Sequence, residues 1–231
     1  MKKCVVSFAN GPGHYLTAMK RLEKSFKDVG FDGDCLMFSS YEEVGSPTHQ
    51  QVPYAFKAYS IKKAIELDYD LILWADSVIH ASKSVAPVFD HIEKYGYLFF
   101  DNIGWTIGDY TSDACLEKHG MSREEAFNSK MLMMCCYGLN MHSLKAAIFA
   151  DHYISAADDG VSYHGDWTNE RGQVSLDKRV LGSRHDQSIA SIIVKQMEFD
   201  ITTGHETYFA YVDHKKVLPV RDTVCLWSGG L

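Results

Sequence analysis

Two aspartates in this sequence are placed to act on a bound ligand, and the first is Asp76. It follows the apolar run 71–75, so a buried strand would deliver its carboxylate to the carboxyl end of a sheet. Hard oxygen ligands suit Mg²⁺ or Mn²⁺, and a cation held there would bind a diphosphate group. The sequence equally allows a structural role, in which Asp76 caps the segment that follows.

The second aspartate, Asp186, belongs to the polar sequence Ser-Arg-His-Asp-Gln-Ser at 183–188, which enters a helix with an isoleucine-rich face. Ser183 and Asp186 have the spacing of a capping arrangement, in which Asp186 would only neutralise free backbone amides and the positive end of the helix. A helix start that is rich in hydrogen-bond donors also suits a bound sugar or anion. Sequence alone leaves both interpretations open.

A third candidate is the turn at 10–13, Asn-Gly-Pro-Gly, which follows the first expected strand. Its glycines would let a ligand approach the backbone closely. The dinucleotide-binding pattern G-x-G-x-x-G needs a third glycine where this chain has Leu16, and the second expected strand ends in Ser39 and Ser40 instead of an acidic residue. These departures disfavour a nicotinamide-dependent dehydrogenase.

Alternating strands and helices must position these groups. Hydrophobic periodicity predicts strands at 5–8, 35–38, 70–75, 97–100, 131–137, 199–201 and 208–212. It predicts helices at 15–29, 53–65, 85–95 and 144–157, a short helix capped by Ser122, and a helix that begins near His185. The run 71–74 does not alternate, which indicates a central strand covered on both faces in a sheet that is parallel in part. The segment 158–183 has no periodicity and is expected to form a long loop.

This order of elements predicts an α/β fold, with an open mixed sheet flanked by helices in one domain over residues 1–231. A net charge of −7 gives no support for sequence-independent binding to nucleic acid. No apolar run approaches the ~20 residues of a membrane helix, and the apolar stretch after Lys3 ends at Asn10, too early for a secretory signal. Six cysteines without C-x-x-C spacing argue against a zinc ribbon and predict a reduced, cytoplasmic protein.

Four blocks in this order resemble a GT-A nucleotide-sugar glycosyltransferase of the glycogenin-like type. They are the first strand with its Asn-Gly turn, the segment 54–77, the sequence Tyr-Gly-Leu-Asn at 137–140, and His-Asp-Gln-Ser at 185–188. In glycogenin-like enzymes the buried strand ends in Asp-Ala-Asp, whereas this chain has Trp74-Ala75-Asp76. The alternative alignment on Asp76-Ser77-Val78 also keeps a single carboxylate, so one acidic metal ligand of the family pattern is missing.

The resemblance implies a GT-A (Rossmann-like) fold and transfer of a sugar from a nucleoside diphosphate, such as a uridine diphosphate sugar, to a carbohydrate or another hydroxyl acceptor. Asp186 and Gln187 resemble the Asp-Gln element of retaining transferases and would lie beside the reacting carbon. Mn²⁺ or Mg²⁺ would be held by Asp76 and a late histidine, His214, with His205 as second choice. Donor-binding roles would fall to Asn10, Gly11, Lys57, Trp74 and Ser77. The acceptor floor would be Tyr137 and Gly138, with Asp101 as a reserve catalytic carboxylate.

Three other functions remain open on sequence. A metal-dependent hydrolase would use the ligands Asp76, His80, His185 and Asp186, although a compact H-x-H or H-E-x-x-H pattern is absent. A carbohydrate-binding domain would keep the fold without the chemistry, as the missing acidic residue at Trp74 allows. A sugar transferase acting on DNA would need a local basic patch, for which the sequence offers Lys215, Lys216 and Arg221.

Overall fold

The computed structural model describes residues 1–11, 13–213 and 219–229. Its strands are β1 (Lys3–Phe8), β2 (Asp34–Phe38), β3 (Leu71–Ala75), β4 (Ile79–Ala81), β5 (Tyr97–Leu98), β6 (Asp101–Thr106), β7 (Lys130–Leu132), β8 (Cys136–Asn140), β9 (Phe209–Tyr211) and β10 (Leu226–Ser228). Its helices are α1 (His14–Asp28), α2 (Tyr41–Val44), α3 (Ala55–Glu66), α4 (Ala86–Tyr95), α5 (Asp113–Lys118), α6 (Arg123–Phe127), α7 (Leu144–Ala157) and α8 (Asp186–Gln196), with 3₁₀ turns η1 (Gly108–Tyr110) and η2 (Gly204–Glu206).

The main sheet has the strand order β2-β1-β3-β8-β5. Strand β1 runs parallel to both β2 and β3, whereas β8 runs antiparallel to β3 and β5. The predicted open mixed sheet is therefore confirmed, and β3 is its central strand. In the register of β3 and β8, Trp74 stands opposite Tyr137. The carboxyl ends of β1 and β3 lie side by side, so Asn10, which follows β1, lies at the same edge of the sheet as Asp76.

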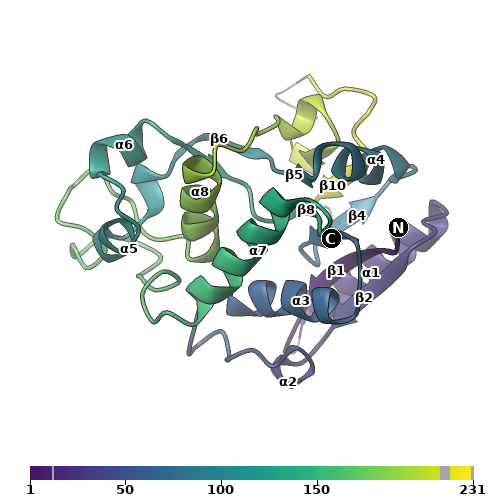
Figure 1. The fold of residues 1–231 in the computed structure, drawn as a ribbon, viewed down its shortest axis with the longest axis horizontal. Helices are drawn as coiled ribbons and strands as arrows, with labels where there is room; N and C mark the ends of the chain where they lie inside the picture. The colour runs from purple at the N-terminus through teal and green to yellow at the C-terminus, as the bar shows by residue number, and fades with distance from the viewer. Residues whose placement is uncertain (12, 214–218, 230–231) are drawn as a thin grey trace.

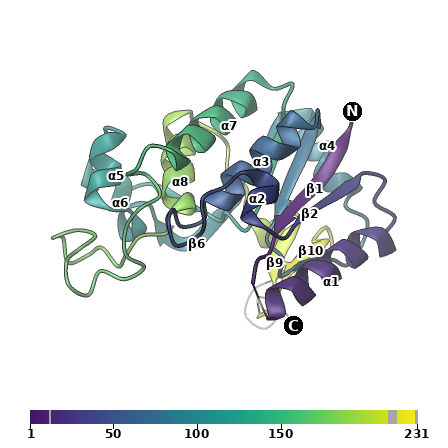
Figure 2. The same cartoon turned by 90° about the horizontal axis from the view of Figure 1, so that it is seen from below.

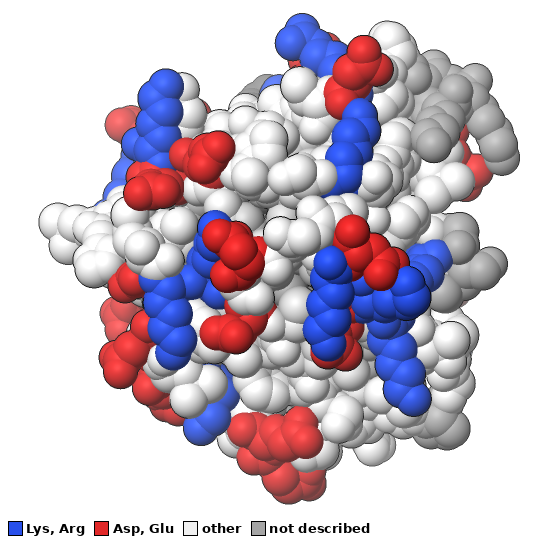
Figure 3. Space-filling model, turned by 90° about the vertical axis from the view of Figure 1, so that its right-hand side faces the viewer, with Lys and Arg blue, Asp and Glu red and all other residues white. Residues whose placement is uncertain are grey.

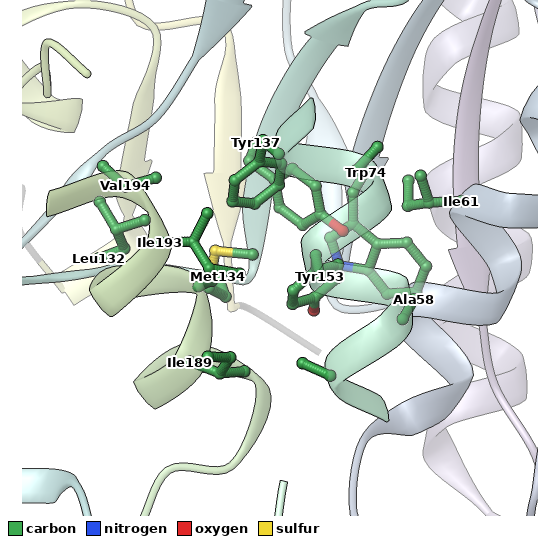
Figure 4. Packing of buried hydrophobic residues seen from close by; sticks show 14 of the residues in the cluster. Ala58, Ile61, Trp74, Leu132, Met134, Tyr137, Tyr153, Ile189, Ile193 and Val194 are labelled. Carbon is green, nitrogen blue, oxygen red and sulfur yellow. The ribbon is translucent and has the colours of Figure 1, made fainter. Parts of the chain in front are cut away.

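Helices cover both faces of β3, as its unbroken apolar run predicts. On one face Trp74 packs in a cluster with Ala58 and Ile61 of α3 and with Tyr153 of α7 (Figure 4). On the other face Leu73 belongs to a second cluster with residues of α1 and α4. Figure 2 shows α3 and α7 on one side of β1 and α1 on the other. Full burial of each such side chain contributes about 1.5–3 kcal/mol, so this layer fixes where β3 ends.

Three predicted strands differ from the structure. The apolar run 131–137 is divided between β7 and β8, because a turn at 133–135 carries the chain from the two-stranded β6–β7 sheet into the main sheet. The segment 97–100 is likewise shortened to β5. At 199–201 no strand forms, and only an isolated bridge joins Thr202 to Phe100. Strand β10 was not predicted; it pairs with β4 and β9 in a small sheet of three strands.

The segment 158–183 contains no helix or strand, as predicted, and extends beyond α5 and α6 at the end of the molecule opposite β1 and β2 (Figures 1 and 2). All six cysteines are free thiols. Within the described residues, no helix combines the length and the apolar character that crossing a bilayer requires.

Candidate active site

Two cavities adjoin at the carboxyl ends of β1 and β3. The first has a volume of about 550 Å³ and is lined by residues 8–10 and 76–78 at the strand ends, with an aromatic wall formed by Tyr15, Tyr41, His49, Tyr54 and Phe56. The second has a volume of about 530 Å³, and its lining includes Asn102, Trp105, Trp167, Arg184, Asp186, Gln187 and Asp213. Tyr54, Lys57 and Asp76 line both cavities, so these three residues form the boundary between them.

A buried ion triad lies at this boundary. Lys57 projects from the first turn of α3, and its side chain is only 6% exposed. Its Nζ lies 3.1 Å from Asp76 Oδ1 and 3.3 Å from Asp186 Oδ2, and it donates a hydrogen bond of 3.1 Å to the Met134 carbonyl. The three ammonium protons therefore have three oxygen partners. The structure brings together Lys57, Asp76 and Asp186 from α3, the end of β3 and the start of α8.

Burial and the charges of the triad shift the pKa values of Asp186 and Lys57. Burial raises the pKa of Asp186 to about 6, with a further contribution from the nearby Asp76 charge, although Lys57 acts in the opposite direction. Burial alone would lower the pKa of Lys57, but the two carboxylates outweigh that effect and raise it above its usual range. Lys57 therefore remains an ammonium group at neutral pH, whereas Asp186 changes its charge in mildly acidic solution.

A hydrogen bond from the buried Trp74 side chain orients the Asp76 carboxylate. The indole is fully buried, and its Nε1–H donates to Asp76 Oδ1 over 2.8 Å. Trp74 lines neither of the two cavities. The donor-binding role that the resemblance implied for Trp74 thus corresponds, in the structure, to a contact with Asp76. A buried indole needs a hydrogen-bond acceptor, and the carboxylate at the strand end supplies it.

Asp186 lies in the first turn of α8, where its charge faces the positive end of the helix. The N-cap residue is His185, with φ 51°, and its side chain forms no capping hydrogen bond, so Ser183 is not the cap that its spacing from Asp186 suggested. Asp186 also pairs with Lys57 and accepts a hydrogen bond of 3.5 Å from the Tyr153 hydroxyl. The Nε2 of the neighbouring Gln187 is buried without a hydrogen-bond partner. Buried polar atoms are rarely left unsatisfied in native proteins, so this amide is a candidate ligand contact.

The remaining predicted donor residues lie around the first cavity with one exception. Asn10 and Ser77 line it, and Asn10 Nδ2 also donates to the Ser39 carbonyl at the end of β2. Gly11 is exposed, adopts φ 89° and is not part of either lining. Its positive φ is the conformation that a glycine tolerates and that the turn after β1 requires.

The residues expected to hold a metal do not form a metal site in the described part of the chain. His214 lies outside the described residues, and among those described no group of three His, Cys, Asp or Glu side chains is arranged to hold a cation. Asp76 Oδ1 is already engaged by Lys57 and Trp74. The described residues therefore do not fit a divalent cation, because an ammonium group stands between the two carboxylates.

The four residues that would hold a metal in a hydrolase do not form a metal-binding cluster in the described chain either. The Nδ1–H of His185 donates a hydrogen bond to the Tyr163 carbonyl, 3.1 Å away, and the His185 ring stacks near Tyr54. Burial lowers the pKa of His185 to about 4. No metal-binding cluster joins it to Asp76, Asp186 or His80 within the described chain, so the predicted four-ligand site is wrong.

The other candidate residues lie away from the triad. Asp101 pairs with Lys130 Nζ at 3.3 Å, and His205 lies in η2; neither lines the two cavities. Of the proposed DNA-binding patch, Lys215 and Lys216 fall outside the described residues, and Arg221 lines a separate cavity with Lys83. On the face shown in Figure 3, Lys and Arg are interspersed with Asp and Glu, so that face offers no continuous basic surface.

Sequence reasoning missed the aromatic and guanidinium groups on the outer side of the second cavity, which are Trp105, Trp167 and Arg184. The two tryptophans occur in segments without periodicity, at 101–113 and 158–183, so no pattern assigns them a face. The only available signal was their presence in a polar loop, where a large aromatic side chain is uncommon.

Comparison with known proteins supports the fold. Neither a protein-family model nor a curated protein sequence matches the chain. A solved structure of a glycosyltransferase involved in the glycosylation of the major capsid of PBCV-1 matches with a TM-score of 0.54. The match has 11% sequence identity and covers 99% of this chain and 92% of that one. The chain therefore has the fold of a glycosyltransferase, and the predicted GT-A-like architecture is confirmed.

Proposed function

We propose that the protein is a glycosyltransferase that moves a sugar from a nucleoside diphosphate to an acceptor hydroxyl. The observation that carries this proposal is the buried Lys57 ammonium between Asp76 and Asp186, at the boundary of two adjoining cavities. A transferase needs two substrate sites that meet at one reacting centre. The glycosyltransferase fold supplies the context in which this arrangement suits sugar transfer.

The first cavity suits the nucleoside diphosphate. Phe8 and Phe56 stack with centroids 4.6 Å apart, and Tyr41 and Tyr54 extend this aromatic wall. Such a wall can hold a planar base, while Asn10 and Ser77 offer hydrogen bonds to the ribose and phosphates. The sugar would then extend across Lys57 toward Asp186. Uridine is the base that we propose, in line with the resemblance described above.

In the reaction, the bond between the anomeric carbon and the diphosphate oxygen breaks, and the acceptor oxygen bonds to the same carbon. Negative charge develops on the leaving diphosphate, and the acceptor hydroxyl loses a proton that the released diphosphate or Asp186 takes up. Among the described residues that line the two cavities, the cationic side chains are Lys57 and Arg184. We assign Lys57 the role of stabilising the leaving group. Asp186, with Gln187, would orient the sugar, and we propose retention of configuration.

Positive charge at this centre comes from Lys57 in our proposal, because the described residues do not fit a divalent cation. The alternative drawn from the resemblance is that Mn²⁺ or Mg²⁺ binds through Asp76 and His214. The two proposals differ in one measurable respect, which is whether the reaction continues when divalent cations are chelated.

The test combines binding and turnover. Uridine, guanosine, adenosine and thymidine diphosphates are screened for thermal stabilisation with EDTA or with Mn²⁺, and hydrolysis of the matching sugar nucleotides is then measured. A ligand at 100 times its Kd raises stability by about 2.7 kcal/mol, which a melting experiment detects. The proposal predicts stabilisation and slow hydrolysis for at least one base in EDTA. If no nucleotide stabilises the protein and no sugar nucleotide is hydrolysed under either condition, the proposal is wrong.

A further inference from the structure

The outer wall of the second cavity consists of aromatic rings around one guanidinium group. The Arg184 guanidinium lies 3.9 Å from the ring centroid of Trp167, 4.2 Å from that of Tyr110 and 5.4 Å from that of Trp105. Trp167 nevertheless remains 51% exposed. Because Trp167 is exposed beside the cavity, a ligand can pack against its flat apolar ring without any rearrangement of the protein.

Backbone contacts hold this wall in position, although it belongs to irregular chain. The amide of Leu181 donates to the Asp109 carbonyl at 2.8 Å, and the amide of Arg184 donates to the Tyr110 carbonyl at 3.1 Å. Arg184 also donates from Nη1 to the Trp167 carbonyl at 2.7 Å. At Gly182 a Cβ atom would lie 2.0 Å from that same carbonyl oxygen, so the two chain segments pack more closely than any side chain allows. The rings are therefore fixed before a ligand arrives.

Among the residues that the structure describes, two side-chain donors beside the second cavity have no hydrogen-bond partner. They are Arg184 Nε and Gln187 Nε2, both buried atoms. A ligand that satisfied them would remove the cost of leaving buried donors unpaired, which is about 1–3 kcal/mol per group. The outer wall of the second cavity thus combines flat apolar rings with hydrogen-bond donors that suit a ligand rich in oxygen acceptors.

We propose that this wall is the acceptor subsite, and that the acceptor is a saccharide. This inference rests on the proposed function, since it identifies the second substrate of the same centre. A pyranose ring has a face of C–H groups, which suits Trp167 and Trp105, and a rim of hydroxyl oxygens, which suits Arg184 and Gln187. Asp186 also lines the second cavity, so a hydroxyl of the bound ring would lie close to the proposed reacting centre.

The charges around the cavity favour a neutral ligand over a polyanion. Asp76 and Asp186 line the second cavity, and its two described cationic side chains are already engaged, Lys57 by these carboxylates and Arg184 by the Trp167 carbonyl and ring. A nucleic acid would bring phosphates toward these carboxylates. A saccharide carries no charge that opposes them. A peptide hydroxyl is the competing acceptor, and the experiment below separates it from a sugar.

The test uses three measurements with the full chain, of which the third is sugar transfer to a methyl pyranoside or to a serine-containing peptide. Saturation-transfer NMR with the methyl pyranosides of glucose, galactose, mannose and N-acetylglucosamine reports saccharide contact without turnover, and hydrolysis of the sugar nucleotide in the absence of acceptor reports the donor side alone. Trp167→Ala should weaken pyranoside contact and sugar transfer by at least about tenfold and should lower hydrolysis far less, because on the donor side its ring contacts only the shared residue Tyr54 among the described residues that line the first cavity. Trp105→Ala should act in the same direction. Leu176→Ala is the matched control, because Leu176 lies in the same loop, is 90% exposed and does not line the cavity.

The outcomes distinguish this inference from the proposed function. If pyranosides contact the wild-type protein and both tryptophan variants equally, or if only a serine-containing peptide accepts sugar, the saccharide subsite is wrong and the transferase stands. If pyranoside contact depends on Trp167 but no sugar nucleotide binds or is hydrolysed, the subsite stands and the protein is a carbohydrate-binding domain. Absence of both signals overturns both proposals.

Discussion

The two cavities that meet at Lys57 are built from different kinds of chain. The first is formed by the ends of β1 and β3 and by the start of α3, which the sheet and its covering helices hold in place. The outer wall of the second comes from β6 with the turn η1 that follows it and from the irregular segment 158–184, which backbone hydrogen bonds and one close glycine contact hold together. In our proposal, donor chemistry therefore depends on the core of the fold, whereas recognition of the acceptor depends mainly on loops at its edge.

The variant Lys57→Met should have the largest effect and act on both regions. It leaves the buried Asp186 carboxylate and the partly exposed Asp76 carboxylate without their shared cation, and loss of the partner from the buried Lys57–Asp186 pair costs about 3–5 kcal/mol. We expect sugar transfer to fall about a thousandfold, because a preorganised charge at the leaving group is lost. Urea unfolding and a transfer assay measure the two effects.

Lys63→Met in the same helix is the control, since Lys63 is partly exposed and pairs only with Glu66. Its unfolding free energy should change by less than about 0.5 kcal/mol. Equal stability and equal activity of the Lys57 and Lys63 variants would show that the triad has no special role.

Asp186→Asn should lower transfer by about a hundredfold while the acceptor wall still binds saccharide. The pKa of Asp186 is about 6, so its carboxylate is charged above that pH and neutral below it. Activity of the wild type should consequently rise with pH through about 6, and the asparagine variant should lack this rise. A pH profile of kcat/KM checks the prediction, and an identical rise in both proteins would assign it to another group.

Trp74→Phe should have a smaller effect that is confined to the donor side. Phenylalanine fills most of the buried space but cannot donate to Asp76, and a hydrogen bond to a charged group contributes about 1.5–3 kcal/mol. We expect a loss of about tenfold in donor hydrolysis, with pyranoside contact unaffected. Loss of saccharide contact in this variant would mean that the two regions are not independent.

Asn169→Ala should have the smallest effect and act only on the acceptor side. The Asn169 side chain bonds the backbone at Val174, Ser175 and Val180, and thereby closes the loop that carries Trp167. We expect transfer to fall about twofold to fivefold, because the ring is held less firmly. Donor hydrolysis should be unchanged, and a parallel fall in hydrolysis would contradict the division between the two regions.

The part of the site that is built on the sheet and its helices could largely be predicted from sequence, whereas the outer wall of the second cavity could not. The strand at 71–75 and the helices around Lys57 and Asp186 follow from periodicity, and the rule that ligands bind at strand ends brings their polar groups together. The run 131–137, Met-Leu-Met-Met-Cys-Cys-Tyr, contains no turn residue, so the turn whose Met134 carbonyl binds Lys57 left no signal. The buried position of Trp74 and its bond to Asp76 depend on packing that only the assembled sheet defines.

The acceptor wall could not be predicted because nonlocal contacts position it. Trp167 reaches the second cavity through hydrogen bonds that join residues near 109 to residues near 181, and no local pattern encodes such pairs. The ion pair of Asp186 with Lys57 could not be predicted for a related reason. A Ser-x-x-Asp spacing fits a cap, but the N-cap residue is His185, and Asp186 in the first turn pairs with Lys57 from a helix far away in the sequence.

Hydrolysis of sugar nucleotides in EDTA, compared between the wild type and Lys57→Met, tests the central claim most directly. If the Lys57 ammonium provides the positive charge at the reacting centre, the wild type hydrolyses at least one sugar nucleotide without a divalent cation, and the variant loses about a thousandfold of that rate. If the wild type is inactive in EDTA and Mn²⁺ restores its activity, the charge comes from a metal and our assignment of Lys57 is wrong.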